Sequence, residues 1–257
     1  MLIRDFEQFD KNNAEALRGL WFLGDVHGEF KWVARALEAA KKAPDWIVFL
    51  GDLDVDRPLR ECLAPMLRDF PQTKVALIHG NHDADSYERW ENFMDHAPAT
   101  WLHGQVVELN GIKVAGLGGN FMGRTWMPDS ASGPSFRNKD KAMNQGAFQH
   151  RGGQRPWPGY HAAIYPDDVE HLAKQRADIL VTHEAPSCHK YGFAELDKLS
   201  RSMRVVRSFH GHHHDDMSDE YALKRDELGF DAKAVNFLAI KNGLGEIVYP
   251  GPKKWQP

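Results

Sequence analysis

The stretch that decides the fold is Trp46-Ile47-Val48-Phe49-Leu50-Gly51-Asp52, an apolar run that stops at a glycine and an aspartate. Its aromatic, β-branched and aliphatic residues favour a β-strand, and a short run without polar alternation is typical of a strand buried on both faces. Asp52 therefore follows the point where this strand leaves the core. A carboxylate in that position can face a ligand.

Four other apolar runs of the chain end in the same way. Their polar ends are Gly24-Asp25-Val26-His27-Gly28, His79-Gly80-Asn81-His82-Asp83, Thr182-His183-Glu184-Ala185-Pro186 and His210-Gly211-His212-His213-His214. Asp, Asn and His provide the oxygen and imidazole nitrogen ligands that divalent metals use. Because ligands bind at the carboxyl ends of strands in open sheets with helical crossovers, we expect the five ends to converge.

Helical periodicity separates most of these strands, which predicts an α/β fold. The expected helices after the first three strands cover residues 30–40, 59–70 and 87–94, and later ones cover residues 167–175 and 194–203. Asn110-Gly111 predicts a hairpin that joins strands 106–109 and 112–117. A second hairpin is expected from strands 235–240 and 246–249, with its turn at Asn242-Gly243.

Residues 120–165 form a long insertion with almost no periodicity. It is rich in cationic and aromatic side chains: Arg124, Arg137, Lys139, Lys141, Arg151, Arg155, Phe121, Trp126, Phe136, Phe148, Trp157 and Tyr160. One interpretation is that this loop closes over the strand ends, attracts phosphate and sets substrate choice. The other is an ordinary basic surface loop whose aromatic residues pack on the sheets.

The chain has 257 residues and a net charge of −4, which fits one large α/β domain over residues 1–257 and argues against a general nucleic-acid binder. It contains no apolar run of the roughly 20 residues needed to span a membrane, and its acidic N-terminus is unlike a signal peptide. These features predict a cytoplasmic protein. The sequence carries no signal of its oligomeric state.

Two cysteines are too few for a disulfide framework. Cys62 lies on an apolar helical face and is expected to be a core thiol. Cys188 follows the His183 strand end and is predicted to be a reactive thiol.

Five motifs occur in a fixed order: Asp25-x-His27, Gly51-Asp52, Gly80-Asn81-His82-Asp83, His183 and Gly211-His212-x-His214. This set, which runs from residue 24 to residue 214, resembles the calcineurin-like metallophosphoesterase superfamily. Five motifs in order, each after a predicted strand, form a specific signal. The resemblance implies a four-layer α/β/β/α sandwich of two mixed sheets.

The resemblance also implies two divalent metal ions, with Mn, Fe and Zn all compatible. Asp25, His27, Asp52 and His214 would hold one ion. Asp52, Asn81, His183 and His212 would hold the other. Asp52 would bridge the pair and be catalytic, a water between the ions would be activated as hydroxide to attack phosphorus, and His82 would protonate the leaving oxygen.

In one motif the chain departs from the superfamily pattern. The second motif usually reads Gly-Asp-x-x-Asp, but Val55 stands where the second Asp is expected. Asp54 or Asp56 is then the candidate that orients His82, and Arg57 is the candidate that holds phosphate. Asp83 is expected to fix the loop that carries His82.

The sequence therefore predicts a phosphoesterase whose substrate is a phosphate ester, for example a nucleotide or a phosphoprotein. The sequence is compatible with both monoester and diester substrates. A nuclease is a less favoured alternative, because the chain shows no added DNA-binding module. A scaffold without catalysis is the least favoured, because every ligand position is occupied.

Overall fold

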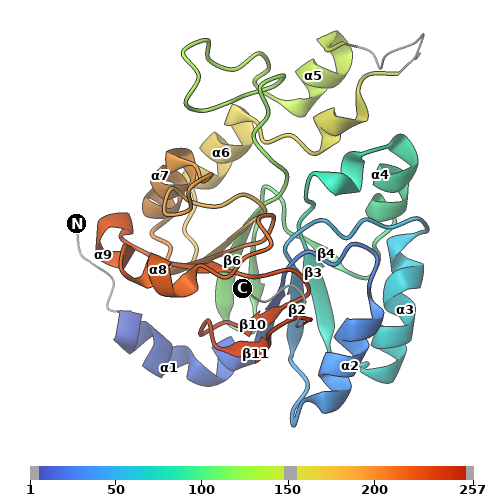
Figure 1. Ribbon diagram of the computed structural model, residues 1–257, viewed down its shortest axis with the longest axis vertical. Coiled ribbons are helices and arrows are strands. Elements are labelled where there is room, and N and C mark those ends of the chain that lie inside the picture. The colour runs from blue at the N-terminus through green and yellow to red at the C-terminus, as the bar shows by residue number, and fades with distance from the viewer. Residues whose placement is uncertain (1–5, 148–154, 253–257) are drawn as a thin grey trace.

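Two mixed β-sheets pack face to face between outer layers of helices (Figure 1). This computed structural model describes residues 6–147 and 155–252. The first sheet has the strand order β11-β10-β1-β2-β3-β4, in which β1 to β4 are parallel. Its strands are β1 (Leu20–Leu23), β2 (Trp46–Phe49), β3 (Lys74–Leu77), β4 (Thr100–Trp101), β10 (Ile240–Asn242) and β11 (Ile247–Tyr249).

The second sheet has the order β5-β6-β7-β8-β9, in which only the β5–β6 pair is antiparallel. Its strands are β5 (Val106–Leu109), β6 (Ile112–Leu117), β7 (Ile179–Thr182), β8 (Arg207–His210) and β9 (Asp231–Ala234). The predicted four-layer α/β/β/α sandwich is thus confirmed.

Helices cover the outer face of each sheet. The first sheet is covered by α2 (Lys31–Ala39), α3 (Leu59–Asp69) and α4 (Tyr87–Met94). The second is covered by α6 (Pro166–Ala173) and α7 (Ala194–Met203), while α8 (Ser218–Ala222) and α9 (Arg225–Leu228) pack beside β9. Helix α1 (Phe6–Arg18) packs its Leu17 into the core between the sheets.

Alternating side chains of each strand enter different cores. Trp21 and Leu23 of β1 face the helices, whereas Leu20 and Phe22 face the second sheet. Successive side chains of a strand point to opposite faces, so burial of both faces requires the continuous apolar runs seen in the sequence. Phe22 stacks on Phe209 of β8 with ring centroids 4.0 Å apart, which joins the two sheets.

The strand register brings the polar ends to one edge of the sandwich. In the first sheet Leu23 pairs with Phe49, and Phe49 pairs with Leu77, so β1, β2 and β3 end level with one another. In the second sheet Thr182 of β7 pairs with His210 of β8. The residues that follow these strands therefore emerge side by side, as expected for the carboxyl ends of parallel strands.

The insertion at residues 120–165 contains more regular structure than its sequence predicts. It includes α5 (Lys139–Gln145) and the 3-10 helix η2 (Pro158–His161), and Figure 1 shows it at the top of the molecule. Tyr160 and Tyr165 form a small apolar cluster with Ala142 and Ala163. The prediction of an unpatterned loop was wrong, because a cluster of this kind draws on residues far apart in the sequence. Phe148 and Arg151 lie outside the described residues.

The first hairpin is confirmed and the second is confirmed only in part. Asn110 and Gly111 have φ of 54° and 80°, the left-handed pair that a type I′ turn requires. In the second hairpin β10 pairs with β11, but residues 235–239 are not a strand. They carry the chain from β9 in one sheet to β10 in the other, and Leu238 donates its N–H to the carbonyl of Asp25 at 3.2 Å.

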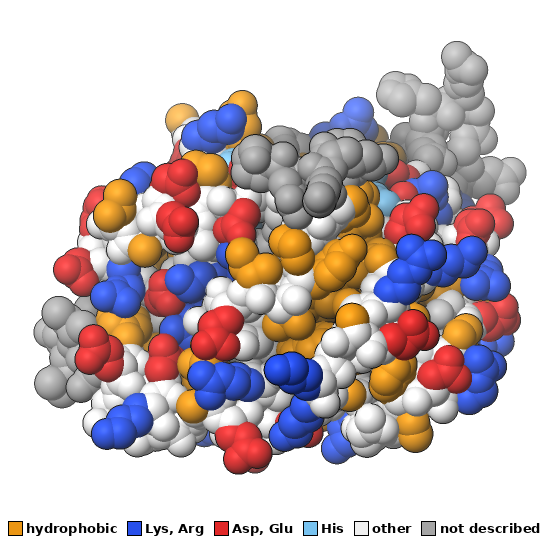
Figure 2. All heavy atoms as spheres, turned by 60° about the horizontal axis from the view of Figure 1, so that its bottom comes forward, with side chains coloured by type: hydrophobic (Ala, Val, Ile, Leu, Met, Phe, Trp, Pro, Cys, Tyr) orange, Lys and Arg blue, Asp and Glu red, His pale blue; other side chains and the backbone are white. Residues whose placement is uncertain are grey.

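Within the described residues, none of the helices is long and apolar enough to cross a membrane. On the face shown in Figure 2, acidic and basic side chains are interspersed around an apolar strip.

The contact between the sheets predicts a large effect of Phe22→Ala. Both Phe22 and Phe209 are fully buried, so the truncation leaves a cavity in the core between the sheets. We expect the free energy of unfolding to fall by about 3–5 kcal/mol, measured by urea denaturation. The control Tyr191→Ala changes a side chain that is 64% exposed and should cost less than about 0.5 kcal/mol. Equal losses in the two variants would contradict the packing argument.

Candidate metal centre

The backbone bends sharply at the residues that follow the strands. His27, Asp52, His212 and His214 have positive φ values of 43°, 50°, 69° and 54°, and Asp54 has φ of 56°. The left-handed region is sparsely populated by residues other than glycine and costs about 1–3 kcal/mol when a fold imposes it. These five make up most of the eight such residues in the described chain, so the strain is concentrated at one place.

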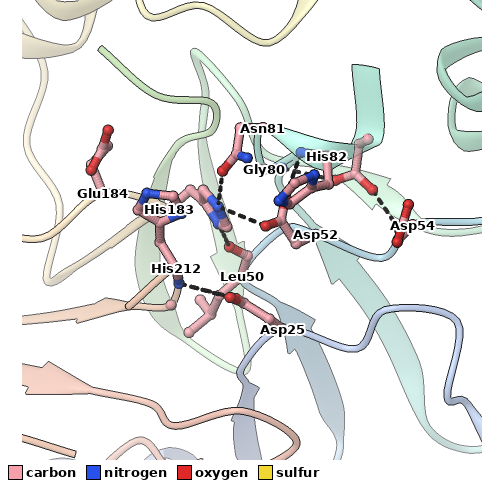
Figure 3. A network of polar contacts seen from close by, with 12 residues as sticks. Asp25, Leu50, Asp52, Asp54, Gly80, Asn81, His82, His183, Glu184 and His212 are labelled. Atoms are coloured by element: carbon pink, nitrogen blue, oxygen red, sulfur yellow. Dashed lines mark hydrogen bonds and ion pairs between the residues drawn. The ribbon is translucent and has the colours of Figure 1, made fainter. Parts of the chain in front are cut away.

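The first group of donor atoms surrounds His183, which lies directly after β7 (Figure 3). Its Nδ1 is 2.8 Å from the carbonyl oxygen of Leu50, which can only accept, so Nδ1 carries the proton. Its Nε2 lies 3.1 Å from Asn81 Oδ1 and 3.3 Å from Asp52 Oδ2. Among the described residues, Asp52, His183 and His212 form one of two groups of His, Asp, Glu or Cys side chains whose donor atoms lie within 4.8 Å of one another.

This arrangement fits a cation. A neutral His183 directs the lone pair of Nε2 at two oxygen acceptors, and three electron-rich atoms that face each other repel unless a positive charge lies among them. Burial alone would lower the pKa of His183, but the carboxylate of Asp52 outweighs it and raises the pKa to about 10. A proton on His183 and a metal ion therefore supply the same missing charge and compete for the position.

The second group consists of Asp25, His27 and His214. Asp25 Oδ2 is 2.8 Å from His214 Nε2, and the Nε2 atoms of His27 and His214 are 3.3 Å apart. Two imidazole nitrogens and a carboxylate oxygen around one point are typical ligands for Mn, Fe or Zn. Asp25 is held in place by the backbone N–H of His212, which donates to both of its oxygens at 3.1 and 3.0 Å.

The two groups are neighbours. His183 and His212 have ring centroids 4.7 Å apart, and the backbone N–H of His27 donates to the carbonyl of Asp52 at 3.0 Å. Burial lowers the pKa of His212 to about 4, so its ring is neutral and available as a ligand. All seven sequence-predicted ligand residues are therefore gathered at the common strand ends.

Comparison with known proteins agrees with this geometry. The sequence pattern of calcineurin-like phosphoesterases matches residues 19–216, which contain both groups. The chain belongs to the calcineurin-like phosphoesterase family. An uncharacterised protein of Haemophilus influenzae is 30% identical over 230 residues, covering 83% of this chain and 92% of that protein.

Solved structures share the phosphoesterase fold at low sequence identity. The protein TT1561 of Thermus thermophilus is 15% identical with a TM-score of 0.51, and the match covers 88% of this chain and 96% of that one. A second crystal structure is 13% identical with a TM-score of 0.52 and covers 87% and 94%. These likenesses concern the fold alone.

Asp83 fixes two loops of the phosphoesterase site. It is fully buried and accepts hydrogen bonds from the backbone N–H groups of Leu53, Asp54 and Gly80 at 2.8–2.9 Å. Asp83 belongs to the 3-10 helix η1 (His82–Ala84), so one carboxylate ties the turn after β2 to the turn after β3. Burial raises the pKa of Asp83 to about 7, and the Asp52 carboxylate adds to the effect.

His82 has a partner that sequence reasoning missed. Its backbone N–H donates to Asp52 Oδ1 at 2.8 Å, and its ring lies 5.6 Å from that of His27. The carboxylate in contact with His82 Nδ1, at 2.8 Å, belongs to Asp85 and not to Asp54 or Asp56. Side chains three residues apart align on a 3-10 helix, so the spacing of His82 and Asp85 was the available signal.

The surroundings of Asp54, Asp56 and Arg57 differ from those that the sequence predicts. Asp54 Oδ2 is 3.4 Å from His27 Nδ1, and Asp54 also forms an ion pair with Arg89 of α4. Asp54 therefore orients a predicted metal ligand instead of His82. Asp56 and Arg57 are exposed, and the backbone carbonyl of Arg57 accepts from the thiol of Cys62 in α3.

The burial of each cysteine determines how reactive its thiol is. Cys62 is buried in the core under α3, as expected. Cys188 is also buried, and this burial raises the pKa of its thiol to about 12. The prediction of a reactive thiol was wrong, because the nucleophilic thiolate is not formed near neutral pH.

The role of Asp83 predicts that its loss weakens metal binding although it is not a ligand. Asp83→Ala removes the acceptor of three backbone N–H groups and should lower metal affinity by about 10–100-fold, measured by calorimetric titration of metal-free protein. Circular dichroism checks that the variant is folded. The exposed Asp56→Ala is the matched control and should bind metal like the wild type. An unchanged affinity in folded Asp83→Ala would contradict the argument.

Proposed function

We propose that this protein is a dinuclear metal-dependent phosphoesterase. The observation that carries the proposal is the pair of adjacent donor groups, in which lone pairs face one another and charge balance calls for cations. Asp25, His27 and His214 would hold one ion, and Asn81, His183 and His212 would hold the other. Asp52 would be a ligand shared by the two ions.

Two divalent ions at such a site lower the pKa of bound water and neutralise phosphoryl oxygens as their charge grows. The protein orients the side chains that would bind the ions. The Leu50 carbonyl fixes the tautomer of His183, and Asp54 accepts from His27 in the same way. The ligand nitrogens of His183 and His27 are therefore aimed before metal binds, which reduces the reorganisation needed at the site.

His82 is the proposed general acid. Its Nδ1 donates to Asp85, an arrangement that leaves Nε2 as the nitrogen available to the leaving oxygen. The side chain is 46% exposed, so it can reach a substrate that enters from solvent. Asp85 is a positioning residue in this proposal, because it acts through His82 by holding its ring.

A phosphate ester is the proposed substrate class. A nuclease is supported less well, because two of the described cationic side chains of the insertion are held in ion pairs. Arg137 pairs with Asp167 and Glu170, and Arg155 pairs with Glu91 while it lies over the ring of Tyr87. Neither of these two side chains is free to follow a long phosphate backbone.

The shared position of Asp52 predicts that Asp52→Asn weakens the binding of both ions at once. The amide has one acceptor oxygen and no charge, so we expect loss of turnover together with fewer than two ions per chain, measured by elemental analysis after gel filtration. Wild-type protein should carry two ions per chain. Active wild-type protein with one ion or none would refute the dinuclear proposal, as would near-normal turnover in Asp52→Asn.

The acid role predicts that His82→Ala retains its metals but slows hydrolysis by about 10²–10⁴. The loss should be large for an alkyl phosphate and small for nitrophenyl phosphate, whose leaving group needs little protonation. Steady-state kcat on both esters tests this. An equal loss on both would instead indicate that His82 binds phosphoryl oxygens.

Asp85→Asn provides a graded version of the same test. It should show a smaller loss with the same dependence on the leaving group, because it misorients the acid without removing it. Asp95→Asn, which changes another carboxylate beside α4, is the matched control and should leave both rates unchanged.

A further inference from the structure

A cavity of about 540 Å³ opens beside the metal centre. Asn81 and Asp85 line it on the side of the strand ends, and Asn120, Arg124 and Trp157 of the insertion line it on the other side. A volume of this size accommodates a small organic molecule. Neither donor group occupies it, so its role is distinct from metal binding.

The place of the cavity identifies which part of a substrate enters it. Asn81 is a predicted metal ligand, and Asp85 holds the ring of His82. A phosphoryl group at the metals, with its leaving oxygen at His82, directs the remainder of the ester toward these two residues. The cavity is therefore in position to receive the leaving group.

The wall formed by the insertion is flat and positively charged. The guanidinium carbon of Arg124 lies 5.2 Å from the ring centroid of Trp157. Arg124 is exposed at the tip of a turn closed by mutual backbone hydrogen bonds between Met122 and Trp126, of 3.1 and 2.8 Å. An indole and a guanidinium plane both stack on aromatic rings, and the charge also attracts phosphate.

Trp157 is fixed before any ligand binds. Its ring packs edge-on against Tyr160 with centroids 5.4 Å apart, and its backbone N–H donates to the carbonyl of Ala147 at 3.2 Å. Gly159 leaves room for the indole, since a Cβ at that position would collide with the ring. A preorganised aromatic wall loses little entropy on binding.

The wall of the cavity also contains the polar residue Asn120. The backbone of Asn120 is held on both sides, by the Ala162 carbonyl at 2.9 Å and the Ile164 N–H at 3.0 Å. Asn120 therefore adds a polar side chain to the wall on a backbone that is already ordered.

We propose that this cavity is a nucleoside subsite and that the enzyme acts on nucleoside monophosphates. The inference rests on the proposed phosphoesterase function. A nucleobase provides the planar ring for Trp157 and Arg124, and its polar groups together with the ribose suit the polar residue Asn120 in the same wall. A phosphorylated Ser or Thr peptide provides no planar ring, so the observations favour a nucleotide.

Hydrolysis of adenosine 5′-monophosphate and of ribose 5-phosphate tests the proposal. The two esters differ by the base alone, so their ratio of kcat/KM measures the subsite. We expect wild-type protein to prefer the nucleotide, and Trp157→Leu to lose about tenfold on the nucleotide and little on ribose 5-phosphate. Trp157→Phe should retain most of the preference. Arg124→Gln should raise KM for both esters, more for the nucleotide, whereas Arg155→Gln, outside the cavity, should match wild type.

Binding provides a second readout that does not depend on turnover. Calorimetric titration of metal-free protein with adenosine should give heat that Trp157→Leu and Gly159→Ala both reduce, the second because its new methyl group displaces the indole. The subsite proposal would be wrong if wild-type protein had equal kcat/KM for the two esters. It would also be wrong if Trp157→Leu lowered kcat/KM equally for both. Hydrolysis of neither ester, with adenosine binding intact, would instead refute the proposed phosphoesterase function.

Discussion

Charge balance at the strand ends is the constraint on which the rest of the site depends. Asp25 and Asp52 are each about 1% exposed, and burial of two carboxylates without compensation is prohibitively costly. Imidazole rings surround them, and His183 Nε2 faces oxygen atoms at 3.1 and 3.3 Å. The fold therefore requires positive charge at this edge, from protons or from cations. Metal binding should therefore stabilise the fold, because a cation supplies the charge that the buried carboxylates lack.

Much of the site could be predicted because its signals are local in sequence. An apolar run that stops at Gly51-Asp52 specifies a strand and its end, and parallel register then places the ends of neighbouring strands at one level. The parts that could not be predicted depend on contacts between distant residues. Arg89 reaches Asp54 from α4, and the segment 235–239 leaves the strand pattern because it crosses between sheets.

The sandwich and the insertion have separate roles and meet where the insertion leaves and rejoins the fold. Asn120 and Ala163 pair where the insertion leaves and rejoins the fold, and Glu184, next to His183, accepts the N–H of Phe121 at 3.2 Å. Burial raises the pKa of Glu184 to about 7. The sandwich thus positions the donor groups, whereas the insertion shapes the space in front of them. Variation in the insertion can change what the cavity accepts without moving a ligand.

The environment of Val55 explains why the carboxylate beside His82 comes from an unusual position. Val55 is 2% exposed and packs in the apolar core beneath α2 and α3, where a carboxylate would be buried without a partner. Asp85 instead lies one turn after His82, at the surface, and Arg89 is 3.8 Å from it. Because Arg89 also pairs with Asp54, one guanidinium lies between the carboxylate that holds His82 and the carboxylate that holds His27. The orientation of the proposed acid and that of a proposed metal ligand are therefore set by a single shared charge, so neither can shift without altering the electrostatics of the other.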